Sequence, residues 1–372
     1  IVNYLFTTKA RVTDESQHDL GCNTMETLSA SSLPDHFDDE KHLDEVLTRP
    51  SEALVEDMAS LDGDILIFGA SGQLGQTICR LAKRAAPDKR IVGVARFLLP
   101  GPRADLESWG VETVTCDLFD RPSIVALPHL PNVVVAAGGR FGPQGDRALG
   151  WMTNTCVPAM IAENFADCRL VTMSSGTVYP LEDVFSQGST EESPTEPVAD
   201  EFANSCLARE RIFQFFSSKH GTSGRIIRLA YAIEVRKGVM QYIARKVYSG
   251  EEIDLGIGHV NVIWQGDFAS QLLRSFKHCT APTTPINVTG PETVSLRDLA
   301  ISLGRIFDKE PIFKGIEAER IWLVNSAKAT RLFGYPIVSL EHMILWTADW
   351  VARRMPSREV PFPGQVRWPI PS

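Results

Sequence analysis

Short apolar stretches alternate with helical stretches over the middle of the chain. Runs rich in Val, Ile and Leu, bounded by Gly or polar residues, occupy positions 64–68, 90–95, 111–116, 132–137, 169–174 and 224–230. Segments with apolar residues at helical spacing lie between them, at 73–85, 148–166 and 199–219. Strands that are apolar throughout are typical of parallel sheets covered on both faces. The pattern therefore predicts an α/β fold with a doubly wound parallel sheet over residues 51–231.

The rhythm changes after residue 231. Helical spacing continues at 236–249, 266–278, 295–307 and 339–355, but the apolar runs at 252–263 and 286–289 are short. We assign residues 232–355 mainly to a smaller C-terminal lobe. Residues 356–372 are rich in proline and are expected to form a non-helical tail.

The first 50 residues are rich in Ser, Thr, Asp and His and show little periodicity, which predicts an acidic, partly disordered extension. Residues 1–60 hold 13 acidic and 4 basic side chains, so the net charge of −9 arises locally. The remaining residues carry 33 charges of each sign. No basic patch dominates the sequence, and we therefore expect no nucleic-acid partner.

Seven cysteines are scattered along the chain without metal-ligand spacing. Such usage favours reduced thiols and a cytoplasmic location. The apolar runs are far shorter than the roughly 20 residues that a membrane span needs, so no membrane partner is expected. No cluster of His, Asp or Glu has ligand spacing, and the sequence predicts no metal site.

The stretch GASGQLG follows the first predicted strand and opens the first long helix. Glycines at this spacing, in this context, are typical of a Rossmann-type dinucleotide site. Gly69 would allow a tight turn, Gly72 would let the backbone approach a pyrophosphate, and Gly75 would let the helix pack against the strand. Free N–H groups at the helix start would bind the phosphates. The predicted cofactor contacts here are Gly69, Ser71, Gly72, Gln73, Leu74 and Gly75.

The second predicted strand ends at Arg96. An acidic residue near this point usually holds the 2′-hydroxyl of NAD, whereas an arginine can meet a 2′-phosphate. The sequence therefore favours NADP over NAD, although Arg96 could also be a solvent-facing residue at a strand end.

Together these motifs resemble the extended short-chain dehydrogenase/reductase group, which includes NAD-dependent epimerases and dehydratases of nucleotide sugars. The resemblance covers roughly residues 63–350 and includes CDL (116–118), AAGG (136–139), WMTNTCVPAM (151–160), MSSGTVYP (173–180) and RLAYAI (228–233). It implies a Rossmann domain with a substrate lobe, a small-molecule substrate such as a sugar or sugar nucleotide, and a homodimer formed through helices 148–166 and 199–219. It also implies further cofactor contacts at Asp117, Leu118, Ala137, Gly138, Asn154 and Leu229.

The chain departs from this family in the helix that starts near residue 200. The family places a catalytic Tyr-x-x-x-Lys motif there, and this chain has Phe202 and Cys206 at those two positions. In the family the tyrosine transfers a proton, and the lysine holds the nicotinamide ribose and favours the ionised tyrosine. A phenyl ring has no proton to transfer, and a neutral thiol supplies no fixed charge. The usual proton relay is therefore excluded.

Three interpretations remain open for the chemistry. Tyr179, four residues beyond the Ser175 that aligns with the family's catalytic Ser or Thr, could supply the proton, or it could be a packed tyrosine. Cys206 could be a nucleophile activated by Arg209, or an inert buried cysteine. The protein could also bind a dinucleotide without turning it over, as a regulatory or scaffold protein. Ser175 itself could contact substrate or cap a turn.

Substrate contacts are expected from segments that the family uses for this purpose. Thr177 lies beside Ser175, and Arg236, His259 and Asn261 fall in the lobe segments. His259 could equally be a hydrogen-bonded strand histidine.

Overall fold

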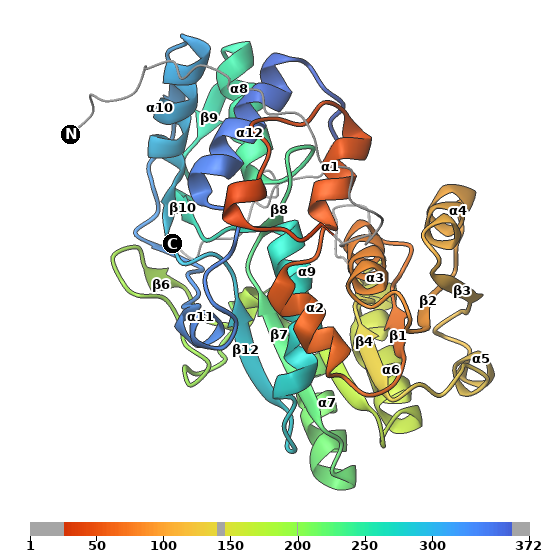
Figure 1. The fold of residues 1–372 in the computed structure, drawn as a ribbon. Helices are drawn as coiled ribbons and strands as arrows, with labels where there is room; N and C mark the ends of the chain where they lie inside the picture. Colours follow the sequence, from red (N-terminus) through yellow and green to blue (C-terminus); the bar gives the residue numbers. More distant parts are fainter. Residues whose placement is uncertain (1–25, 140–145, 199, 359–372) are drawn as a thin grey trace, which may run out of the picture.

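The computed structural model describes residues 26–139, 146–198 and 200–358 (Figure 1). Its centre is a seven-stranded sheet in which all neighbouring strands are parallel. In spatial order the strands are β12 (Thr284–Val288), β7 (Gly224–Leu229), β5 (Arg169–Ser175), β4 (Asn132–Val135), β1 (Ile65–Phe68), β2 (Ile91–Ala95) and β3 (Glu112–Thr115). The predicted α/β fold with a doubly wound parallel sheet is confirmed.

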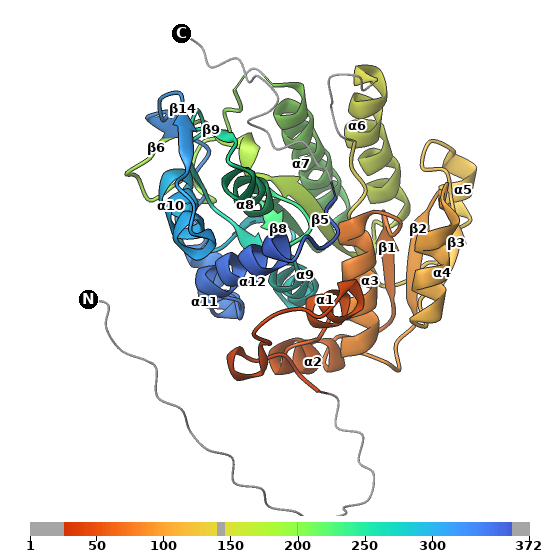
Figure 2. The same cartoon turned by 90° about the horizontal axis from the view of Figure 1, so that it is seen from above.

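Helices cover both faces of this sheet (Figure 2). One face packs against α2 (Glu52–Ala59), α3 (Gln73–Ala85), α4 (Pro100–Ser108), α9 (Gln265–Arg274) and α11 (Ala327–Phe333). The other face packs against α5 (Arg121–Val125), α6 (Arg147–Asn164) and α7 (Glu201–His220).

Strand β1 shows why the apolar runs fold in this way. All four of its residues are fully buried. Side chains alternate across a strand, so Ile65 and Ile67 join the core beneath α3, whereas Leu66 and Phe68 join the core beneath α6. Each such side chain contributes about 1.5–3 kcal/mol through burial, which holds both helix layers on one strand.

The last strand of the sheet comes from the region that the sequence assigned mainly to the lobe. After β7 the chain leaves the sheet and returns through α9 and η3 (Ser275–His278) to β12, which pairs with β7 in parallel. Residues 265–288 therefore belong to the sheet domain. The prediction placed the strand correctly but not its partner, because the apolar pattern of a strand does not specify its neighbour.

The smaller lobe has its own core, built mainly from α8 (Val239–Ser249), α10 (Leu296–Phe307) and α12 (Leu340–Ala352). Short strands complete it and link it to the sheet domain. They are β6 (Glu182–Asp183), β8 (Ala232–Ile233), β9 (Glu252–Asp254), β10 (His259–Val260), β11 (Ile263–Trp264), β13 (Val294–Ser295), β14 (Ile312–Lys314) and β15 (Arg320–Ile321).

From residue 26 onward the N-terminal extension packs against the lobe. A short η1 (Ala30–Ser32) precedes α1 (Glu40–Leu47), whose Leu43 is fully buried in the lobe core. The Phe37 ring lies 4.7 Å from the Trp346 ring, and Trp346 Nε1 donates to the Pro34 carbonyl at 2.8 Å. Residues 1–25 of the extension and 359–372 of the tail lie outside the described residues.

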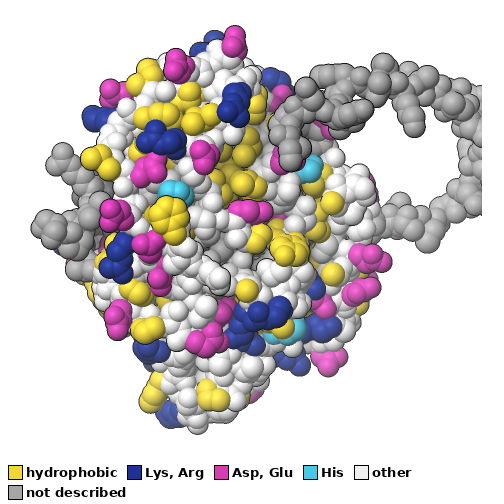
Figure 3. All heavy atoms as spheres, turned by 90° about the vertical axis from the view of Figure 1, so that its left-hand side faces the viewer, with side chains coloured by type: hydrophobic (Ala, Val, Ile, Leu, Met, Phe, Trp, Pro, Cys, Tyr) yellow, Lys and Arg dark blue, Asp and Glu magenta, His cyan; other side chains and the backbone are white. Residues whose placement is uncertain are grey.

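Two whole-molecule observations bear on partners. Within the described ranges, no helix combines the length and apolarity needed to cross a bilayer. On the side where α10 and β6 lie, charges of both signs are interspersed with apolar side chains (Figure 3).

Candidate functional site

The turn between β1 and α3 requires glycine at its first position. Gly69 has φ +85°, and a Cβ there would lie 2.8 Å from the Ala137 backbone nitrogen at the end of β4. A side chain is thus excluded both by conformation and by the neighbouring strand. The turn is therefore pressed against the carboxyl end of β4.

The start of α3 is closely packed on one side and open on the other. A Cβ at Gly75 would lie 2.1 Å from the Gly69 carbonyl oxygen, so only glycine lets the helix approach the turn. Gly72 is the exposed N-cap, and no side chain caps the helix there. Ser71, Gln73 and Leu74 are half-buried around it. The first-turn N–H groups and the helix dipole of such an open end favour a bound anion.

Lys237 brings a positive charge to this turn from the lobe. Its Nζ donates to the Gln73 Oε1 at 2.6 Å. The sequence analysis missed Lys237, because the two residues are 164 positions apart and share no motif. Its position beside the helix start makes it a candidate contact for the same anion.

Arg96 and Asp117 lie at the same carboxyl edge as the glycine turn, just beyond β2 and β3. Both side chains are exposed. The Asp117 Oδ1 accepts a hydrogen bond from the Phe119 N–H at 3.0 Å, and Leu118 between them is half-buried. Parallel strands present their carboxyl ends together, so all three residues border the region where ligands bind in such sheets.

The end of β4 is held by Asn154, which is fully buried on α6. Its Oδ1 accepts from the Gly139 N–H at 2.8 Å, and its Nδ2 donates to the Gly139 carbonyl at 3.1 Å and to Ser205 Oγ at 2.9 Å. The amide of Asn154 thus holds the loop after β4, and its expected contact with the cofactor stays a prediction. Ala137 is half-buried and Gly138 is exposed, so these two residues form the accessible wall.

Helix α7 carries the two positions where the family has its catalytic pair. Asp200 caps the helix by accepting from the Ala203 N–H at 2.7 Å, and Gly221 ends it in the left-handed conformation. Cys206 is buried in an apolar cluster, against which Phe202 packs. Burial raises the pKa of the Cys206 thiol to about 11. The thiol is therefore neutral at physiological pH, which supports an inert cysteine and argues against a nucleophile.

Tyr179 is fully buried, and its hydroxyl is already occupied. It donates to Asn287 Oδ1 at 2.8 Å and accepts from Arg228 Nη1 at 2.6 Å. Arg228 in turn pairs with the buried Glu210 at 2.7 Å. Burial raises the pKa of Tyr179 to about 12, against the opposing effect of Arg228. This geometry supports the packed tyrosine rather than the proton donor.

Ser175 and Thr177 provide a polar pair at the carboxyl end of β5. Their hydroxyl oxygens lie 2.9 Å apart, and Ser175 Oγ also accepts from the Thr177 N–H at 3.2 Å. The serine thus caps the short η2 (Gly176–Val178), as one interpretation predicted. Both side chains remain half-buried, and Leu229 lies beside Ser175 at the end of β7.

Two of the expected substrate residues have structural partners instead. Arg236 is buried and pairs with Glu40 and Asp44 of α1 at 3.1 and 2.8 Å. Asn261 Oδ1 accepts from the Val324 N–H at 2.9 Å, and its Nδ2 donates to the Glu292 carbonyl at 3.0 Å. These contacts were invisible in the sequence because each joins distant segments.

The third expected substrate residue, His259, lies in β10, which pairs with β13 in antiparallel fashion. Its side chain is half-buried, and its Nδ1 is buried without a hydrogen-bond partner among the described residues. The backbone of His259 therefore pairs as expected of a strand histidine. The hydrogen bond expected of its ring is missing at Nδ1 among the described residues.

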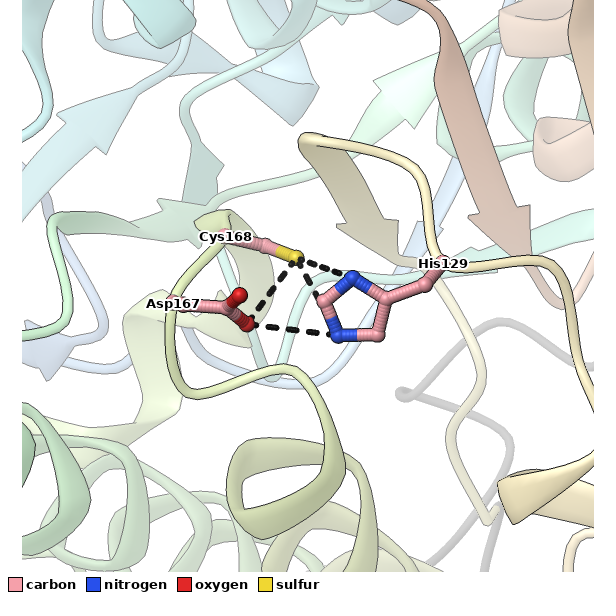
Figure 4. Close-up of side chains that lie close together, drawn as sticks. All are labelled: His129, Asp167 and Cys168. Atoms are coloured by element: carbon pink, nitrogen blue, oxygen red, sulfur yellow. Dashed lines mark hydrogen bonds and ion pairs between the residues drawn. The ribbon is translucent and has the colours of Figure 1, made fainter.

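A side-chain cluster that sequence spacing could not reveal lies at the opposite, amino edge of the sheet (Figure 4). Ligand-type atoms of His129, Asp167 and Cys168 all lie within 4.8 Å of one another. Burial raises the pKa of Cys168 to about 12, so its sulfur stays protonated. The exposed His129 Nε2 lies 3.2 Å from Asp167 Oδ1, and the imidazole stacks on Phe165. These contacts account for the way in which the three side chains gather.

Comparisons with known proteins agree with this geometry. The sequence profile of the NAD dependent epimerase/dehydratase family matches residues 65–279. UDP-glucuronic acid 4-epimerase from Bacillus cereus, solved with NAD, superposes with a TM-score of 0.65 at 17% identity, covering 78% of this chain and 99% of that one. UDP-glucose 4-epimerase from Thermotoga maritima, solved with UDP-glucose, gives 0.64 at 18%, with coverages of 78% and 99%.

A dehydratase has the same fold. The dTDP-glucose 4,6-dehydratase from Bacillus anthracis, solved with NAD, gives a TM-score of 0.65 at 14% identity and covers 78% of this chain and 96% of its own. The search of curated protein sequences found no match. Since the family profile spans more than half of the residues and includes the glycine turn and the helix α7, this chain belongs to the NAD-dependent epimerase/dehydratase family.

Proposed function

We propose that this chain is a nicotinamide-dinucleotide-dependent oxidoreductase of the epimerase/dehydratase type that acts on a sugar nucleotide. The turn between β1 and α3 carries the proposal. Gly69 and Gly75 close it so tightly that no side chain fits, while Gly72 leaves the helix start open. A pyrophosphate matches these N–H groups in charge and in shape. A bound dinucleotide would supply the hydride acceptor or donor.

The form of the cofactor depends on Arg96. Its exposed guanidinium at the end of β2 favours a 2′-phosphate and hence NADP. Two structures of similar fold were solved with NAD, which favours NAD instead. An exposed arginine at a strand end can equally face solvent, so we give the comparison more weight and propose NAD as the cofactor.

For the substrate side we assign Ser175 and Thr177. Their hydroxyls form the polar pair at the end of β5, where a reacting carbon would lie close to the cofactor. Similar structures hold UDP-glucose or UDP-glucuronic acid, which supports a sugar nucleotide. The proton relay is non-standard, because neither Phe202, Cys206 nor Tyr179 offers an accessible titrating group.

The lack of an accessible titrating group at Phe202, Cys206 and Tyr179 also favours a second candidate function. A site whose α7 face is an apolar cluster could bind the dinucleotide without turnover, as a regulatory or scaffold protein. The two functions share the glycine turn and differ in what happens after binding.

The substitution Gly72→Ala tests whether the turn between β1 and α3 binds a dinucleotide. We expect the fold to tolerate this change. The nearest atom to the new Cβ is the Gly69 oxygen at 3.4 Å, an ordinary contact, and Gly72 has a φ of −73°. The methyl group would instead meet the pyrophosphate. We expect an unchanged melting temperature and NADH binding weakened by about tenfold in a fluorescence titration. Gly101→Ala, where nothing lies within 4 Å of the new Cβ, is the matched control.

Equal NADH affinity in the wild type, Gly72→Ala and Gly101→Ala would overturn dinucleotide binding at this turn. Turnover is then followed with NAD and UDP-glucose or UDP-glucuronic acid by chromatography of the sugar nucleotides, because an epimerase or dehydratase returns the hydride to the sugar and leaves no net NADH. Binding that depends on Gly72 but converts neither sugar nucleotide would favour the silent binding protein.

A further inference from the structure

Arg209 places a buried positive charge at the carboxyl edge of the sheet. It follows Cys206 on α7 by three residues, so both side chains lie on the same face of the helix. Its Nη1 donates to the Met173 carbonyl of β5 at 2.9 Å, and its Nη2 donates to Asn154 Oδ1. The guanidinium therefore joins α6 and α7 to the end of β5.

The same guanidinium lies directly behind the accessible wall of the site. A Cβ at Gly138 would lie 3.0 Å from Arg209 Nη2. Gly138 is exposed at the end of β4, whereas Arg209 is only 5% exposed. A single glycine backbone thus separates the charge from the region that a ligand would occupy.

This charge is incompletely compensated by the protein. The buried Glu210 beside Arg209 on α7 acts favourably on the guanidinium, but this carboxylate is paired with Arg228. Among the described residues no carboxylate forms an ion pair with Arg209, and its buried Nε has no hydrogen-bond partner. Burial lowers the pKa of the guanidinium, but an arginine keeps its proton at neutral pH. Retaining a buried charge with only two neutral acceptors is costly unless it serves a bound group.

The neighbouring position 206 cannot supply such a charge. The Cys206 thiol is neutral, and it faces the apolar cluster of Val178, Tyr179, Ala230 and Val324. Side chains on a helix lean toward its N-terminus, so the long side chain of Arg209 can deliver its charge one turn before its own Cα.

We infer that Arg209 is a positioning residue that replaces the missing lysine charge, holding the end of β4 and orienting the oxygen-rich dinucleotide against it. This inference rests on the proposed function. Because a guanidinium does not release its proton, Arg209 contributes charge and orientation and takes no part in proton transfer.

The test compares NADH dissociation constants of charge variants by fluorescence titration. Arg209→Gln removes the charge and is expected to weaken binding by about tenfold. Arg209→Lys keeps it and should bind within about threefold of the wild type. The double variant Cys206→Lys/Arg209→Gln returns the charge to the position where relatives carry a lysine, and it should recover most of the lost affinity.

Arg225 provides the matched control for general loss of packing. It is also 5% exposed, its Nε is likewise without a partner in the described part of the chain, and it begins β7 at the opposite, amino edge of the sheet. Arg225→Gln should lower the melting temperature as Arg209→Gln does, but leave the NADH affinity unchanged.

Several outcomes would overturn the inference. Arg209→Gln could bind NADH as the wild type does, or a folded double variant could bind no better than Arg209→Gln. If the double variant does not fold, equal affinities of Arg209→Lys and Arg209→Gln decide against the charge. A wild-type protein that binds no dinucleotide instead overturns the proposed function, so the two failures are distinguishable.

Discussion

At the scale of single residues, the α7 side of the site combines Phe202 with the buried Cys206 and Tyr179. The absence of tyrosine at 202 and lysine at 206 can be read directly from the chain. The fate of Tyr179 cannot, because its hydroxyl is taken by Asn287, which is 108 residues away. Local motifs carry no information about such partners. The glycines differ, because the need for glycine arises within the single turn between β1 and α3. The seven residues GASGQLG are therefore enough to predict it.

The reactivity of Cys206 is a direct residue-scale prediction. With its pKa raised to about 11 by burial, very little Cys206 thiolate exists at pH 8. Iodoacetamide should therefore label Cys206 in the native protein at least about 100-fold more slowly than in the urea-unfolded protein, as followed by peptide mass spectrometry. Comparable labelling of Cys206 in the native and the unfolded protein would revive it as a nucleophile.

At the scale of elements, helices and strands with strong periodicity were predicted within a few residues. The expected 73–85 helix is α3, and the expected 169–174 strand is β5 with one further residue. The pairing of strands was harder to predict from the sequence. The strand β12 was predicted, but its place beside β7 was not predicted. Helix α1 was missed because it is short, four of its eight residues are charged, and its apolar residues are only Leu43, Val46 and Leu47.

Helix α1 is tied to the lobe by an ion-pair network around Arg236. The arginine and Glu234 side chains are 4% and 1% exposed and lie 2.9 Å apart. Arg236→Gln would leave a buried carboxylate without its partner and should lower the free energy of unfolding by about 3–5 kcal/mol in urea titrations.

Glu40→Gln is the matched control for this network. Glu40 meets the same guanidinium, but its side chain is 41% exposed, so its loss should cost less than about 1 kcal/mol. If Arg236→Gln proved as mild as Glu40→Gln and instead weakened substrate binding, the substrate role first expected of Arg236 would return.

At the scale of the whole molecule, the two lobes meet at the carboxyl edge of the sheet. The glycine turn belongs to the sheet domain, while Lys237, which reaches Gln73, belongs to the lobe. Sequence analysis predicted both lobes from the change of rhythm after residue 231. Sequence analysis could not predict the hydrogen bond between Lys237 and Gln73, because contacts between the lobes depend on how the chain returns through α9 and β12.

Self-association is the prediction that belongs to this scale. The family resemblance implies a dimer through the helices now seen as α6 and α7. Leu149 and Met152 on α6 are 46% and 44% exposed, and Phe215 on α7 is 61% exposed, so these helices offer apolar side chains to a partner. We expect a dimer in light scattering after size exclusion, and a monomer for Met152→Glu. Thr155→Glu, a half-buried polar position on the same helix, would serve as the comparison. A wild-type monomer would contradict this prediction.

The packing of Phe37 has a practical consequence for handling the protein. Its ring packs against both the Trp264 and Trp346 indoles, at centroid distances of 6.2 and 4.7 Å, and the family profile begins only at residue 65. A recombinant fragment trimmed to the recognisable family boundary would remove Phe37 and uncover part of both indoles. Expression of the folded part of the chain should therefore begin upstream of Pro34, well outside the region that homology alone would select.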